Sequence, residues 1–222
     1  MDQRHFDLQL SHLKERLLLM AARAEALINT AIEAVGTKDA AMAEHIFALD
    51  REIDRMEIDI ENEAIALMAL HQPMGGDLRF LVGAIKINND LERIGDHGVN
   101  IAQSALKLAG EPDITPLVDI PQMSELALAM LRDSLESFIA GDYEKAREVC
   151  RRDDQVDSLK RHVLVKLSMI MGEKPETIGR GIELILVSRN LERIADLATN
   201  ISEETIYIVQ AKVIKHRFED SQ

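Results

Sequence analysis

Paired carboxylates spaced four residues apart are the side chains of this chain whose type and spacing could do chemistry. Asp50 and Asp54 form one pair, and Glu92 and Asp96 form a second. Because side chains at positions i and i+4 lie on one face of an α-helix, each pair would present its oxygens together. Carboxylate oxygens are the ligands that hard cations prefer in proteins. The same two pairs return later in the chain as Asp153, Asp157, Glu192 and Asp196.

A shared metal site follows in each half if the helices that carry the two pairs pack antiparallel. The pairs would then converge at one level, and bridging carboxylates could hold more than one ion. This donor set suits iron, Mg²⁺, Mn²⁺ or Ca²⁺, and the pattern does not distinguish among them. Asn100 and Asn200 continue each line of oxygens by one turn, and Arg93 and Arg193 directly follow the glutamates. We expect these four residues to surround the ligands, and the two asparagines could also join them.

A solvated acidic surface is the alternative interpretation of the carboxylates, with Arg93 and Arg193 as their ion-pair partners. The chain has 39 Asp and Glu against 26 Lys and Arg, a formal net charge of −13, so acidic helix surfaces are common in it. Two carboxylates at i and i+4 on an exposed helix repel each other by about 0.2–0.5 kcal/mol. The duplication favours the metal interpretation, because both pairs recur with their spacing kept while the residues around them differ.

An internal repeat divides the chain into two similar halves. Residues 91–101 match residues 191–201 at seven of eleven positions, and earlier acids such as Asp50 and Asp153 match at an offset of 103. Apolar residues recur at intervals of three and four, which is typical of amphipathic helices. We predict an all-α fold of two tandem three-helix bundles, residues 1–110 and 121–222, joined by a proline-containing linker at 111–120. The six helices are expected near 6–35, 39–70, 77–109, 121–140, 142–171 and 177–217.

Composition and missing motifs exclude several classes of protein. The negative charge, with two Tyr, five Phe and no Trp, argues against nucleic-acid binding. The sequence contains no phosphate-binding glycine loop, no Glu-x-x-His pair and no evident base beside the single thiol of Cys150, so we do not expect an enzyme. The longest apolar run, 64–70, is far shorter than the ~20 residues that span a bilayer, and residues 1–12 do not resemble a signal peptide. We expect a cytoplasmic protein.

The repeated segments Leu91–Asp96 and Leu191–Asp196, with the turn Gln72-Pro73…Asp77-Leu78-Arg79, resemble the signature of the PhoU family. This resemblance covers nearly the whole chain, and Ala195 replaces the usual glycine of the second signature. It implies two similar three-helix bundles with metal on the two carboxylate quartets. It also implies a negative regulator of phosphate uptake and of the phosphate-starvation response. Such a protein would connect the phosphate ABC transporter with a sensor histidine kinase, through peripheral membrane association and as a homodimer.

Two other functions fit the residues without the resemblance. A metal-dependent hydrolase would use carboxylate-bound metal to cleave phosphate esters, and it would need a cleft and a bound water. A metal-free structural bundle would leave the acids solvated. The resemblance favours the adaptor and regulator over both, and the absence of a nucleophile and of a nucleotide-binding loop favours docking over turnover.

Overall fold

Six long α-helices make up almost all of the computed structural model, which describes residues 2–114 and 119–211. No strand occurs in these two ranges, so the all-α prediction of six helices is confirmed. A short 3₁₀ turn, η1 (Pro175–Thr177), precedes the last helix. The helices are α1 (Asp2–Thr37), α2 (Ala40–His71), α3 (Gly76–Leu108), α4 (Asp119–Ala140), α5 (Tyr143–Glu173) and α6 (Ile178–Gln210).

The observed helix boundaries lie close to the predicted ones, with two differences at the sixth helix. It begins at Ile178, directly after the 3₁₀ turn and one residue later than predicted. It ends at Gln210, since Ala211 takes a left-handed conformation with φ of 55°. The predicted continuation over 212–217 lies outside the described residues. The proposed linker at 111–120 stays a prediction, although α4 begins at Asp119, inside it.

The repeat extends to the caps of equivalent helices. The Asp39 carboxylate accepts a hydrogen bond from the Met42 amide at the start of α2, and Asp142 accepts one from Lys145 at the start of α5. Such caps satisfy amides that have no partner within the helix. The preceding residue is left-handed in both turns. Gly141 adopts this conformation freely, whereas Lys38, at φ of 57°, has a side chain that disfavours it.

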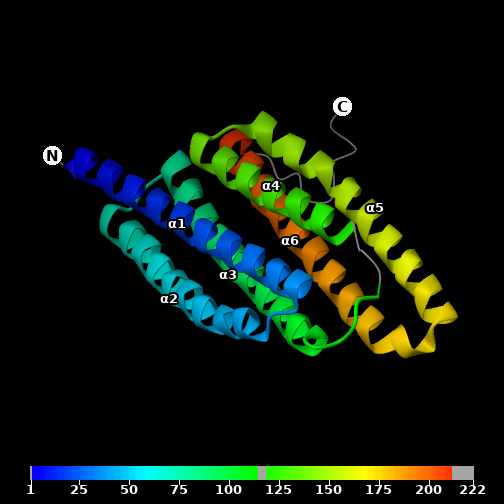
Figure 1. Cartoon of the computed structure of the whole chain (residues 1–222). Coiled ribbons are helices and arrows are strands. Elements are labelled where there is room, and N and C mark those ends of the chain that lie inside the picture. The colour runs from blue at the N-terminus through cyan, green and yellow to red at the C-terminus, as the bar shows by residue number, and fades with distance from the viewer. Residues whose placement is uncertain (1, 115–118, 212–222) are drawn as a thin grey trace.

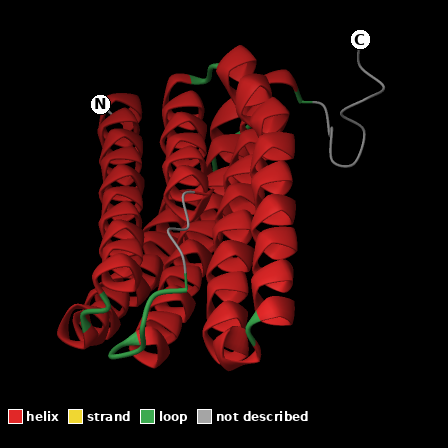
Figure 2. Ribbon diagram, turned by 45° about the vertical axis from the view of Figure 1, so that its right-hand side comes forward, coloured by secondary structure: helices red, strands yellow, loops and turns green. Residues whose placement is uncertain are grey.

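Each half of the chain forms a three-helix bundle, and α3 and α6 join the two bundles (Figure 1). These two helices run antiparallel, because Ser104 contacts Glu183 while Lys86 contacts Glu204. The long axes of all the helices are roughly aligned in the second view (Figure 2). The apolar stripes of each bundle pack inward, and their fully buried residues include Leu17, Leu27, Ile53, Ile94, Val156, Val163 and Ile194.

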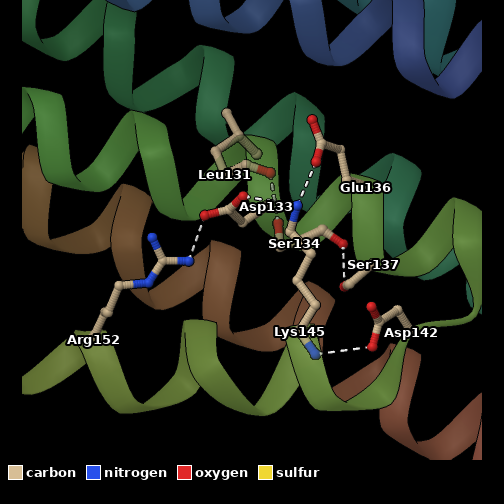
Figure 3. A network of polar contacts seen from close by, with 8 residues as sticks. All are labelled: Leu131, Asp133, Ser134, Glu136, Ser137, Asp142, Lys145 and Arg152. Carbon is tan, nitrogen blue, oxygen red and sulfur yellow. Dashed lines mark hydrogen bonds and ion pairs between the residues drawn. The ribbon is translucent and has the colours of Figure 1, made fainter.

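A network of ion pairs fixes the start of α5 against α4 (Figure 3). The Asp133 carboxylate lies 2.6 Å from an Arg152 nitrogen and 3.0 Å from the Lys145 ammonium, which also pairs with Glu136. Burial raises the pKa of Asp133, but hydrogen bonds from Lys145 and Arg152 outweigh it and hold the pKa below its usual value. The network anchors the turns of α5 that immediately precede Asp153.

None of the helices in the described ranges combines the length and the apolar character that a membrane-crossing segment needs.

Candidate metal sites on the paired bundles

The first carboxylate quartet forms where α2 faces α3. The Asp50 carboxylate approaches α3 at Gly95, where a Cβ would stand 3.4 Å from Asp50 Oδ1 and 3.3 Å from an Ile53 methyl carbon. Glycine at this position therefore allows the helices and the carboxylate to come close. Asp54 lies one turn further along α2, and Glu92 and Asp96 lie on either side of Gly95 on α3. The two predicted pairs thus come together across the helix interface.

The mutual repulsion of the first quartet is visible in its pKa values. Burial, followed by the charges of Asp54 and Asp96, raises the pKa of Asp50 to about 6. Burial also raises the pKa of Glu92, with further contributions from Asp96, Asp54 and Glu57. Because charges on both helices act on one another, the four carboxylates share a single electrostatic environment.

The second quartet repeats this arrangement between α5 and α6. Burial, followed by the charges of Asp196 and Asp157, raises the pKa of Asp153 to about 6. The pKa of Asp196 is raised mainly by burial and by Glu192, although Arg193 opposes the rise. Asp50 and Asp153, which occupy equivalent positions of the repeat, therefore both have a pKa raised to about 6, which the sequence comparison alone could not establish.

The two quartets differ in the cations around them. In the second quartet, the Lys160 ammonium lies 2.9 Å from Glu192, and an Arg193 nitrogen lies 2.8 Å from Asp196. In the first quartet, Arg93 turns to Asp90 at 3.3 Å. Within residues 2–114 and 119–211, no Lys or Arg nitrogen lies within 4.0 Å of any of the four carboxylates Asp50, Asp54, Glu92 and Asp96.

Glu57 and Lys160 account for much of this difference, and the prediction of ligands did not include them. They occupy equivalent positions at the 103-residue offset of the repeat. Burial, with Glu61 and Asp54, raises the pKa of Glu57, so a fifth acid joins the first quartet where the second has a cation. Extending the repeat comparison from matching residues to charge reversals would have identified this pair.

The chemistry of the donors fits a hard cation, although the side chains do not form a finished cage. In the part of the chain that the structure describes, no three His, Cys, Asp or Glu side chains converge so as to hold one metal ion. Rotation of the carboxylates about their side-chain bonds would be required. Glu192 is 8% exposed, and its Oε2 has no hydrogen-bond partner among the described residues, with only Arg193 Nε at 3.6 Å. Such an orphaned buried oxygen suits an additional cationic ligand.

The residues expected around the ligands have separate locations. Arg193 contacts the second quartet directly, whereas Arg93 contacts Asp90. Asn100 and Asn200 are both exposed and line two grooves between α3 and α6. The structure therefore brings the eight acids into two groups of four and places the two asparagines outside them.

A duplicated three-helix bundle with carboxylate pairs on facing helices is the class of protein that this fold and these sites define. The family model described as "PhoU domain" matches residues 17–105 and residues 120–205, one match in each bundle. The chain belongs to the PhoU family. This membership confirms the resemblance inferred from the two signature segments.

Relatives and solved structures agree with this assignment over nearly the full length. The "Phosphate-specific transport system accessory protein PhoU homolog" of Clostridium acetobutylicum is 38% identical, over 96% of this chain and 98% of the relative. A relative of the same name from Aquifex aeolicus is 40% identical, over 94% of this chain and 95% of its own. The crystal structure of PhoU from Pseudomonas aeruginosa has a TM-score of 0.89 at 32% identity, covering 93% of this chain and all of that one.

Proposed function

We propose that this protein is an accessory regulator of phosphate-specific transport. It would restrain phosphate uptake and the phosphate-starvation response when phosphate is plentiful. Its carrying observation is the similarity to relatives named as accessory proteins of that transport system, over more than nine tenths of both chains. In this role it acts in the cytoplasm as an adaptor between the phosphate ABC transporter and a sensor histidine kinase, attached to the membrane only peripherally and able to form a homodimer.

The one thiol of the chain, Cys150, is poorly suited to nucleophilic chemistry, which agrees with an adaptor role. Burial, followed by the charges of Glu203 and Asp153, raises the pKa of Cys150 to about 12. A thiol with this pKa stays protonated at neutral pH and reacts slowly. We therefore assign no catalytic step, and we keep the metal-dependent hydrolase as an alternative that metal-loaded protein and phosphate-ester substrates would test.

The two quartets are the proposed metal sites of this regulator. Asp50, Asp54, Glu92 and Asp96 would hold the ion or ions of the first bundle, and the matching acids of the α5–α6 interface would hold those of the second. A bound hard cation would supply positive charge where the carboxylates repel one another. We propose that the first quartet binds more tightly, because Glu57 adds an acid there while Lys160 and Arg193 partly neutralise the second.

Gene deletion and complementation test the regulatory role. A deletion strain grown in excess phosphate should express a phosphate-starvation reporter, and the intact gene should silence it. A variant with Asp50→Asn and Asp96→Asn should silence the reporter incompletely if metal matters for regulation. Glu52→Gln, an exposed acid on the same helix, should behave like the wild type. Normal repression in the deletion strain would refute the regulatory role. Full function of the double variant would refute only the proposal that regulation requires metal at the first quartet.

Direct capture tests the adaptor role separately from regulation. Tagged protein incubated with membranes from phosphate-replete cells should retain the transporter and the kinase, and membranes lacking either one should show which contact depends on the other. Retention of neither would contradict the adaptor role while leaving the regulatory role to the reporter experiment.

A further inference from the structure

Two grooves between α3 and α6 lie at equivalent ends of the antiparallel pair, and their charges are opposite. One groove, of about 310 Å³, includes Lys107, Arg189 and Arg193 in its lining and no carboxylate. We call it the basic groove. The other, of about 590 Å³, includes Glu57, Glu61 and Glu204 in its lining. We call it the acidic groove.

The difference arises from substitutions at equivalent positions of the repeat, whose third and sixth helices match at an offset of 100. Five of these make the basic groove more positive, and one, Leu186 in place of Lys86, has the opposite effect. The backbones of α3 and α6 are equivalent in both places, so the side chains set the charge, and Glu57 and Glu61 of α2 add to it in the acidic groove. The five pairs, with the basic-groove member first, are Gln103 and Glu203, Ser104 and Glu204, Lys107 and Tyr207, Arg189 and Asn89, and Asn190 and Asp90.

The basic groove contains hydrogen-bond donors that no carboxylate of the described residues occupies. Arg189 is exposed, and within the described ranges no carboxylate oxygen lies within 4.0 Å of its guanidinium. The amides of Asn100 and Gln103 also line the groove. The other two cations have partners at the rim, with Lys107 3.0 Å from Glu183 and Arg193 2.8 Å from Asp196.

We propose that the basic groove binds a phosphate group, either as free inorganic phosphate or as a phosphomonoester. A guanidinium presents parallel N–H donors that match two oxygens of a tetrahedral oxyanion, and amide groups can satisfy the remaining oxygens. In a chain of net charge −13, a concave surface without lining carboxylates repels an anion less than the acidic groove does, although Glu183 and Asp196 contact two of its cations. None of the eight quartet acids lines the site, and of its lining cations only Arg193 contacts them, at Asp196 and Glu192.

Equilibrium binding to chelator-treated protein tests this site without metal. Full-length protein is titrated with inorganic phosphate, with phosphoserine as a monoester and with sulfate as a less charged tetrahedral anion. The decisive variant is Arg189→Ala, and the matched control is Arg93→Ala, which removes an exposed arginine from the acidic groove. We expect one phosphate per chain, bound about tenfold more weakly by Arg189→Ala and unchanged by Arg93→Ala. Circular dichroism and thermal melting confirm that both variants are folded.

Each outcome of the titration decides a separate point. Tighter binding of inorganic phosphate than of phosphoserine would support the proposal and identify the free ion as the ligand, and the reverse order would support a phosphoryl group carried by another molecule. Absence of binding by any of the three anions would overturn the proposal. Equal loss of affinity in the two variants would also overturn it, because the effect would then reflect overall charge. Regulation tested by the reporter could fail or succeed independently of this result.

Discussion

Replacing Asp50 with asparagine should stabilise the metal-free protein at neutral pH. The change keeps the shape of the side chain but removes a negative charge that lies half-buried against Gly95 and near Asp54 and Asp96. Natural proteins accept such local repulsion where function requires it, and removal of a functional charge then raises stability. The prediction concerns folding alone and does not assume that a metal binds.

The size of the gain follows from the pKa of Asp50. The pKa rises from 3.8 to about 6 on folding, so between these values the folded state binds more protons than the unfolded state. Stability is therefore lost as pH rises through this window. The rise corresponds to an upper limit of about 3 kcal/mol above pH 6, and solvent screening of a partly exposed carboxylate reduces this to about 1 kcal/mol. The gain for Asp50→Asn should disappear as the pH falls to 3.8.

Denaturant unfolding followed by circular dichroism measures this gain across pH. In chelator, Asp50→Asn should exceed the wild type by about 1 kcal/mol at pH 7.5, a rise in Tm of roughly 2–4 °C. Glu52→Gln on the same helix should change neither value. A loss of stability at pH 7.5, or a gain that stays constant down to pH 4, would refute the electrostatic reasoning. Added Mn²⁺ should then stabilise the wild type more than the variant, which tests the metal site separately.

Two further predictions concern helix packing and the unequal quartets. Gly98→Ala should destabilise the protein by about 1–3 kcal/mol, because its Cβ would stand 2.1 Å from a methyl carbon of the buried Leu27. Gly179→Ala, with no atom within 4 Å of its Cβ, should instead stabilise the protein by up to about 1 kcal/mol. Thermal melting measures both changes. Lys160→Gln should tighten Mn²⁺ binding in the second bundle, as measured by calorimetry, because it removes the cation 2.9 Å from Glu192. Unchanged affinity would show that Lys160 does not compete with the metal.

The fold was largely predictable because helical signals are local and the repeat supplies them twice. Apolar spacing and proline positions placed the helices within a few residues of their observed ends, apart from the end of the sixth, which was predicted at 217 and lies at Gln210. The 3₁₀ turn at Pro175 and the left-handed Ala211 depend on short-range backbone geometry that apolar spacing does not record. The antiparallel contact of α3 with α6 joins residues far apart in sequence, so periodicity could not establish it.

The grouping of the acids was predictable for a different reason. Spacing of four residues placed each pair on one helix face, and the helix order made convergence of the pairs geometrically reasonable. The local counter-charges differ between the copies, since Arg93 and Arg193 stand at identical positions of the repeat and yet contact different acids. Both contacts lie within the arginine's own helix, and the position equivalent to Asp90 is Asn190 in the second copy, so Arg193 has no acid three residues before it.

Duplication offers a reason for differences between sites that are built on one scaffold. Equivalent positions have equivalent backbones, so a change of charge at one copy can alter a site without altering the fold. Glu57 and Lys160 differ in this way beside the quartets, and Arg189 and Asn89 differ in this way beside the grooves. The acids are retained at both quartets, whereas the charges around them differ. We expect this pattern when one copy keeps a strong cation site and the other copy has its cation affinity changed. Comparison of the two halves within a single chain thus distinguishes the residues that maintain the fold from those that set each site's charge.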